Sequence, residues 1–307
     1  MTAQSVILPP PSNHARFIVL RLKDLSISQL KQQIEALLST RDRLITQHPN
    51  DQIKTAIAFG PELWAQLYHH VPENFKQLDP QSGAFDMPVV PADVFIHIAS
   101  ARADLCFAMS QAFFNGIQDQ VEVLDERACF RFLDGRDLTG FIDGTENPQF
   151  PDDRADAALL PADAGVFAEG SFIFAQRYIH DLTKWQKLKV DAQEHVIGRT
   201  KLESIELDDD VKPQNAHITR TVIEDDEGEE MEILRHSLPY GDGQGDQGLF
   251  FVAYTNNLNI IDQMLQRMFG TAGDGIHDRL LHFTTAIDGA YYFAPSEELL
   301  AQVLESA

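Results

Sequence analysis

The order of predicted strands and helices is the feature that most constrains how this 307-residue chain can fold. In the first half, apolar residues at strand and helix spacing indicate a strand over 17–22, a helix over 24–39, strands over 55–59 and 93–99, a helix over 101–114 and a strand over 121–132. The resulting order, β-α-β-β-α-β, is that of the ferredoxin-like unit, in which an antiparallel sheet carries its helices on one face.

The second half repeats this order. The pattern indicates a strand over 171–178, a helix over 183–196, paired strands over 218–223 and 231–235, a strand over 249–255, a helix over 258–269, a short strand over 290–293 and a last helix capped by Ser296. Such a repeat is the mark of an internal duplication. We therefore predict an α+β fold of two tandem ferredoxin-like units, residues 1–139 and 140–307, with antiparallel sheets and helices outside.

Charge limits the partners of this chain. Its net charge of -23 comes from 24 basic and 47 acidic side chains, and such a surface repels phosphate backbones and anionic lipids. No apolar run approaches the roughly 20 residues of a membrane span. The first residues lack the basic and long apolar regions of an export signal. We therefore expect a cytoplasmic protein that binds neither nucleic acid nor membranes.

The two cysteines, Cys106 and Cys129, have apolar neighbours. This setting favours buried free thiols, and a disulfide between them is the alternative.

A loop over 140–148, Gly-Phe-Ile-Asp-Gly-Thr-Glu-Asn-Pro, follows a predicted strand and carries two turn signals, Asp-Gly and Asn-Pro. One interpretation is a connecting loop with polar tips. The other is that the turn fixes the carboxylate of Asp143 at a defined point, where it can act as a general acid or base.

His217 and Arg235 are the next candidates, at the two ends of a predicted hairpin. If the turn at 225–228 centres near Asp226, the two residues lie opposite each other and bring a possible metal ligand beside a permanent cation. A one-residue bulge would break this pairing, and most single histidines are not ligands. The acidic runs 206–210 and 224–232 lack the spacing of a calcium loop and indicate solvated turns.

Taken together, the motifs resemble those of dye-decolorizing peroxidases, and specifically the compact bacterial B-type group. The resemblance is carried by the loop over 140–148 and extends over essentially the whole chain. Its other fragments are Phe95-Ile-His-Ile98, Asp104 to Phe107, Val196 to Glu203, Leu207 to Asp210, Ala216-His217, Ile233-Leu-Arg235, Asp278 to Leu281 and Gly289 to Ser296.

The resemblance implies one haem b per chain, bound in the second half. The chain contains no Cys-x-x-Cys-His motif, so this haem would be held non-covalently. His217 would be the axial ligand of the haem iron, with Asp278 accepting the other ring N–H. Asp143 and Arg235 would be catalytic on the opposite face, and the Arg235 cation would keep Asp143 ionised by offsetting the cost of burying it. Further cofactor-binding positions are Arg199, which would bind a haem propionate, Glu146 and Phe251.

The implied function is a peroxidase that reduces hydrogen peroxide to water and oxidises bulky aromatic reductants, such as dyes and phenols, in one-electron steps. A homo-oligomer, dimeric or larger, is expected. Two departures from the family pattern are Ser237, where some members carry asparagine, and His282, where aspartate is common. The alternatives are a protein that binds haem or removes its iron, and a protein whose acidic loops hold a divalent metal.

Overall fold

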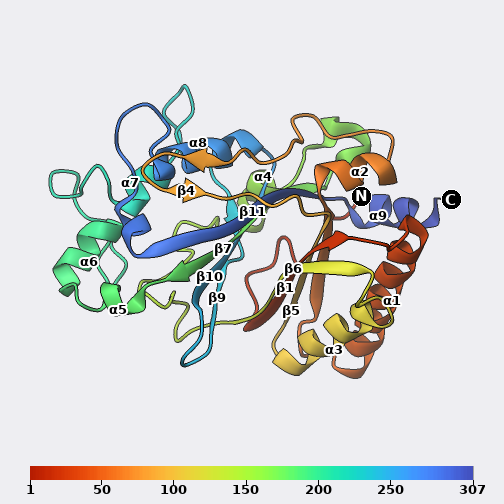
Figure 1. Ribbon diagram of the computed structural model, residues 1–307. Helices are drawn as coiled ribbons and strands as arrows, with labels where there is room; N and C mark the ends of the chain where they lie inside the picture. Colours follow the sequence, from red (N-terminus) through yellow and green to blue (C-terminus); the bar gives the residue numbers. More distant parts are fainter. Residues whose placement is uncertain (307) are drawn as a thin grey trace.

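The computed structural model describes residues 1–306, and its first half has the predicted ferredoxin-like order. The elements are β1 (His14–Leu22), α1 (Ile27–Gln47), β2 (Lys54–Phe59), α2 (Pro61–Leu67), the short strands β3 (Gln81–Ser82) and β4 (Asp86–Met87), β5 (Val94–Ser100), α3 (Ala103–Phe114) and β6 (Val121–Phe130). The long strands lie side by side in the order β6-β1-β5-β2 and are antiparallel. Helices α1 and α3 cover one face of this half-sheet (Figure 1).

The second half repeats the topology, as the sequence predicted. Its elements are α4 (Pro151–Ala158), a 3-10 helix (Ala162–Phe167), β7 (Ser171–His180), α5 (Leu182–Trp185), α6 (Val190–Ile197), α7 (His217–Thr221), β8 (Leu234–Arg235), β9 (Leu238–Gly241), β10 (Gln247–Thr255), α8 (Leu258–Phe269), a 3-10 helix (Arg279–His282), β11 (Thr284–Ala294) and α9 (Glu297–Glu305). The strand order is β11-β7-β10-β8, with β9 also paired to β10. In each half, the first strand (β1 or β7) lies between the last strand (β6 or β11) and a third strand (β5 or β10). This shared order confirms the predicted α+β fold.

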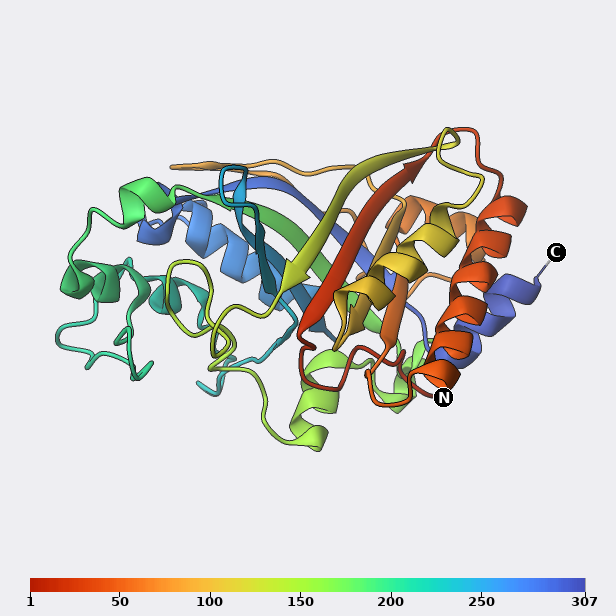
Figure 2. The same ribbon diagram turned by 90° about the horizontal axis from the view of Figure 1, so that it is seen from below.

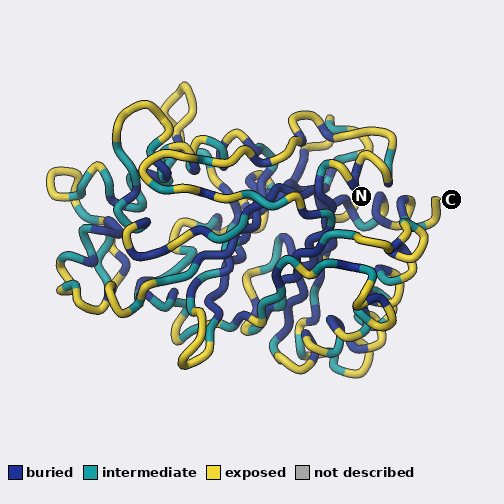
Figure 3. The backbone as a smooth tube through the Cα atoms, viewed as in Figure 1, coloured by how far each residue is buried: buried dark blue, intermediate teal, exposed yellow. Residues whose placement is uncertain are grey.

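The two half-sheets are joined in two ways. At their edges, β2 and β11 pair at Phe59 and Phe293, so that the strands form one continuous sheet. The faces turned away from the helices share one core, in which the rings of Phe17 and Phe250 stack at 4.6 Å and those of Phe95 and Tyr292 at 5.2 Å. Figure 2 shows the two groups of strands from below, and Figure 3 shows buried residues concentrated where they meet.

The segment over 218–223 was predicted as a strand, and this prediction is wrong. Ile218, Thr219 and Val222 favour a strand by their branched side chains, but the structure forms helix α7 here. The guanidinium of Arg267 on α8 explains the difference, because it donates to the carbonyls of Thr219, at 2.6 Å, and Val222, at 2.5 Å. The turn over 225–228 forms as predicted, closed by the Gly228 amide donating to the Asp225 carbonyl at 3.1 Å.

Other elements differ in extent. The predicted helix over 183–196 is divided into α5 and α6. Trp185, at the end of α5, is buried in a small core with Phe141 and Phe283. The predicted strand over 231–235 keeps only β8. Cys106 and Cys129 are buried free thiols, as expected. None of the helices in residues 1–306 is long and apolar enough to cross a membrane.

The shared core gives a stability prediction. Phe250 is 1% exposed and stacks on Phe17, so Phe250→Ala should lower the free energy of unfolding by about 3–5 kcal/mol. Urea denaturation followed by circular dichroism measures the change. The control is Phe150→Ala, at a side chain that is 71% exposed, which should change it by less than about 0.5 kcal/mol. Equal effects of the two variants would contradict the shared core.

Candidate functional site

One large cavity lies on the helix-covered face of the second half-sheet. Its empty space, including the open mouth, is about 1490 Å³. All its lining residues fall between positions 137 and 284, and most are apolar. Most of them come from the loop before α4 and from β7, β8, β10, α7 and α8. The apolar ones include Ile218, Leu249, Phe251, Ile261, Met264, Leu265 and Met268.

The loop over 134–147 forms one wall of this cavity. It doubles back on itself, with a bridge between Arg136 and Ile142. The Arg136 guanidinium fixes the loop by donating to the carbonyls of Gly140 at 2.9 Å, Lys201 at 2.6 Å and Leu202 at 3.0 Å. Gly140 has a φ of 91°, and a Cβ there would meet the Lys201 side chain at 2.7 Å. The positive φ favours glycine at this turn, whereas the Lys201 side chain could move away.

The loop places Asp143 on the cavity wall opposite Arg235 of β8. The Arg235 Nη1 atom lies 3.9 Å from Asp143 Oδ1, and both side chains are about three-quarters buried. Both residues line the cavity. The structure therefore brings together two residues that are 92 positions apart and that the sequence analysis had predicted as neighbours.

The electrostatics of Asp143 differ from the expectation that Arg235 offsets its burial. Enclosure of the carboxyl raises the pKa of Asp143, the Arg235 cation lowers it, and the nearby Asp137 carboxylate raises it again. Together, these effects leave the pKa of Asp143 above its usual value. Arg235 thus compensates for burial only in part, and Asp143 is a stronger base than an exposed aspartate.

Asn147 holds Arg235 in place, and the sequence analysis missed it. Its side-chain Nδ2 donates to the Arg235 carbonyl at 2.9 Å, and its Oδ1 accepts from the Arg235 amide at 2.9 Å. Gly144, with a φ of 80°, leaves room for this amide, which would lie 3.2 Å from a Cβ there. The Asn-Pro pair signalled a turn, but no pattern in the sequence links it to β8.

His217 is the first residue of α7 and faces the cavity with 27% of its side chain exposed. Its Nδ1 lies 2.6 Å from Asp278 Oδ2, and the Asp278 side chain is fully buried. The other Asp278 oxygen accepts from the Leu280 amide at 2.8 Å and caps the following 3-10 helix. Asp278 therefore fixes the orientation of the His217 ring.

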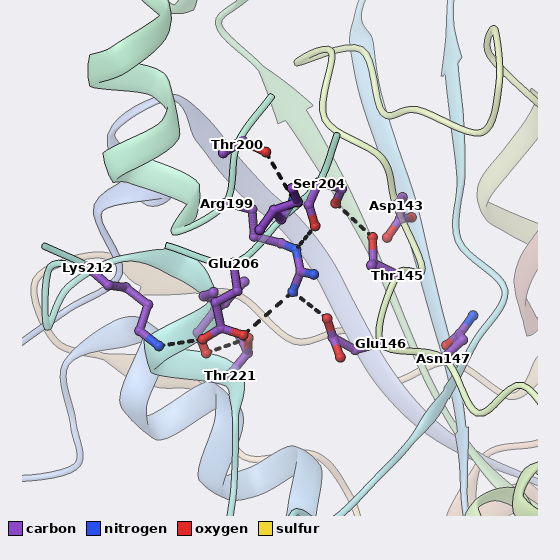
Figure 4. A network of polar contacts seen from close by, with 12 residues as sticks. Asp143, Thr145, Glu146, Asn147, Arg199, Thr200, Ser204, Glu206, Lys212 and Thr221 are labelled. Carbon is purple, nitrogen blue, oxygen red and sulfur yellow. Dashed lines mark hydrogen bonds and ion pairs between the residues drawn. The ribbon is translucent and has the colours of Figure 1, made fainter. Parts of the chain in front are cut away.

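Arg199 and Glu146 lie at the cavity edge and form an ion pair (Figure 4). Arg199 also donates through Nε to the Ser204 carbonyl at 2.8 Å and lies 3.8 Å from Glu206. Figure 4 shows Glu206 paired in turn with Lys212, and Thr145 with Ser204. Phe251 of β10 contributes to the apolar wall.

The predicted hairpin pairing of His217 with Arg235 is wrong, because His217 lies in a helix. Both residues nevertheless line the same cavity. Of the two departures from the family pattern, Ser237 is buried and its hydroxyl accepts from the Val252 amide at 3.2 Å. His282 lies 3.2 Å from His277, between ring nitrogens. Neither lines the cavity. In residues 1–306, no three His, Cys, Asp or Glu side chains gather to hold a bare metal ion.

A polar group of Asp137, Thr139, His180 and Thr284 also lines the cavity and was not among the predicted site residues. His180 ends β7, and Asp137 lies in the turn before Asp143. Neither position has a sequence signal beyond its residue type.

The Asn147 clamp predicts a stability loss. Asn147→Ala leaves the amide and carbonyl of the part-buried Arg235 without these partners, so the free energy of unfolding should fall by about 1–3 kcal/mol. Urea denaturation measures it. Asn259→Ala, at an exposed position of α8, is the matched control and should be nearly neutral. A neutral Asn147→Ala would show that the clamp does not stabilise the site.

Two family models match nearly the whole chain: Dyp-type peroxidase, N-terminal, over residues 4–131, and Dyp-type peroxidase, C-terminal, over residues 134–299. A dye-decolorizing peroxidase of Mycolicibacterium paratuberculosis is 34% identical over 303 residues, which cover 96% of this chain and 84% of that protein.

Solved structures agree with this comparison. A dye-decolorizing protein from V. cholerae superposes with a TM-score of 0.91 at 38% identity, covering 99% of both chains. A variant of DypB from Rhodococcus jostii RHA1 in complex with heme superposes with a TM-score of 0.90 at 34% identity, covering 98% of this chain and 99% of that one.

Proposed function

We propose, from the premise that this chain belongs to the Dyp-type peroxidase family and is a haem peroxidase, that it reduces hydrogen peroxide to water and oxidises bulky aromatic reductants in one-electron steps. One observation carries the proposal. One cavity is lined by a carboxylate paired with an arginine, Asp143 with Arg235, and by a histidine, His217, whose partner behind the wall is the buried carboxylate of Asp278.

The residues of the cavity fit one haem b held non-covalently. The apolar side chains of β10, α7 and α8 suit a large flat ring, and Phe251 would lie against it. His217 would bind the iron through Nε2. Arg199 would bind a propionate and exchange part of its contact with Glu146 for it. Neither cysteine lines the cavity, in keeping with non-covalent binding.

Bound haem would supply an iron that binds peroxide and stores oxidising equivalents. Asp143 would accept a proton from one peroxide oxygen and return it to the other, so that water can leave. Arg235, 3.9 Å from Asp143, would stabilise the negative charge that develops as the O–O bond breaks. The Asp278 carboxylate would hold the His217 Nδ1 proton and make the ring a more electron-rich ligand.

We infer that bulky reductants donate electrons at the protein surface, because haem bound in this cavity would leave little room for them. We infer a cytoplasmic protein that binds neither nucleic acid nor membranes, and its net charge of -23, which repels phosphate backbones and anionic lipids, supports the absence of these partners. Exposed apolar side chains, among them Leu133, Leu202 and Ile205, support a homo-oligomer. The boundary between the two ferredoxin-like units, placed between residues 139 and 140, stays a proposal.

A protein that only stores haem or removes its iron would need His217 but not the Asp143–Arg235 pair, so this pair favours the peroxidase.

The first prediction of the proposed function concerns the reaction with peroxide. Asp143→Ala and Arg235→Leu should each retain haem, and at least one should react with hydrogen peroxide orders of magnitude more slowly in a stopped-flow measurement of the haem spectrum. If both variants react at the wild-type rate, the assignment of these residues fails.

The second prediction concerns pH. Asp143 must be ionised to accept a proton, and burial raises its pKa. The rate constant should therefore be full above this raised pKa and fall as the pH drops through it, at a higher pH than an exposed aspartate would give. Asp143→Asn should abolish this acid limb. A limb that persists in the variant would belong to another group.

The third prediction concerns the iron ligand. His217→Ala should lose or severely weaken haem binding, measured as the ratio of haem to protein after reconstitution. Asp278→Asn should keep the haem but shift its reduction potential upward, because a weaker hydrogen bond leaves the ring less electron-rich. Full occupancy with an unchanged spectrum in His217→Ala would refute the ligand assignment.

A further inference from the structure

A second carboxylate–histidine pair lies in the wall of the cavity. Asp137 Oδ1 is 3.1 Å from His180 Nε2, and His180 Nδ1 is 2.8 Å from the Thr284 hydroxyl. The other Asp137 oxygen accepts from the Thr139 amide at 2.9 Å and from the Thr139 hydroxyl at 2.5 Å. All four residues line the same cavity as Asp143.

This pair is enclosed and well satisfied. The His180 side chain is 5% exposed and that of Asp137 13%, and both ring nitrogens and both carboxylate oxygens have partners. Burial alone would raise the pKa of Asp137, but His180 and the two Thr139 donors outweigh it and lower this pKa to about 2. Asp137 therefore carries a negative charge at neutral and mildly acidic pH.

The fold sets this charge beside Asp143. Asp137 and Asp143 lie on opposite arms of the doubled-back loop, where the Asp137 amide donates to the Phe141 carbonyl at 2.9 Å and the Asp143 amide to the Gly135 carbonyl at 3.0 Å. The charged and titratable groups that act on Asp143 are Arg235 from β8, His217 from α7 and Asp137. Of these, only Asp137 has the same sign as Asp143.

We propose that the Asp137–His180 pair is a positioning element for the acid–base step: it keeps a fixed negative charge beside Asp143 and thereby sets the pH range in which Asp143 accepts the peroxide proton. The inference rests on the proposed role of Asp143. Asp137 acts through Asp143 and need not touch peroxide, because its charge disfavours ionisation of its neighbour.

His180 is the second part of this positioning element. Its ring orients Asp137, and its positive charge offsets part of the Asp137 charge at Asp143. Glutamine at this position keeps an N–H donor for Asp137 but cannot carry the positive charge.

The test follows the protonation of Asp143 directly. In infrared spectra of the haem-loaded protein, the carbonyl stretch of protonated Asp143 is the band that Asp143→Asn removes. In Asp137→Asn this band should disappear at a lower pH than in the wild type as the pH is raised. The acid limb of the peroxide reaction should move in the same direction, giving a several-fold higher rate constant on that limb relative to its plateau.

His180→Gln should move both measurements the opposite way, to higher pH, because it leaves the Asp137 charge uncompensated. Opposite directions would not arise from a structural role, in which both variants would disturb the loop alike. Asp181→Asn is the matched control: it removes an exposed charge next to His180, and asparagine can still cap α5. It should leave the infrared titration unchanged.

The inference is overturned if Asp143 titrates as in the wild type in Asp137→Asn, or if Asp137→Asn and His180→Gln shift it in the same direction. If Asp137→Asn does not fold, a wild-type titration in His180→Gln overturns it alone. Failure of the proposed function looks different: Asp143→Asn would then react with peroxide at the wild-type rate, whatever the infrared titration shows.

Discussion

Three aspartates, Asp137, Asp143 and Asp278, lie in or directly behind the wall of one largely apolar cavity, and the energy of burying their charges shapes the rest of the site. Asp278 is compensated by His217 and a helix amide, and Asp137 by His180 and Thr139. Asp143 has a longer ion pair with Arg235 and the least complete compensation. Structural carboxylates are thus satisfied at short distances, whereas the carboxylate proposed to exchange protons keeps a raised pKa. A fully satisfied Asp143 would be a weak base.

The duplicated fold places this site by strand alternation. Along β10, Leu249 and Phe251 face the cavity, whereas Phe250, Val252 and Tyr254 point into the core shared by the two half-sheets. One strand therefore contributes to the cavity with one face and to the junction of the halves with the other. The first half-sheet supports the cavity from behind without lining it.

The sequence predicts the order of strands and helices along the chain well, because apolar periodicity is local and the second half repeats the first. It fails over 218–223, where branched side chains favour a strand but contacts from Arg267 stabilise a helix. Six of the predicted site residues line the cavity, and Asp278 lies behind His217; their roles stay predictions. Asn147 and His180 were missed because each acts through partners many positions away, and the pKa of Asp143 depends on an enclosure that no local pattern reports.

The contact of Asn147 with the backbone of Arg235 has a consequence for protein engineering. The loop over 140–148 carries Asp143 and, through the side chain of Asn147, is hydrogen-bonded to the backbone of Arg235 in β8. The two side chains are therefore held by one connected frame. A loop grafted from a relative would bring its own carboxylate but would also have to reproduce these hydrogen bonds, so loop and strand β8 have to be exchanged together. Directed evolution of the loop alone would meet the same restriction.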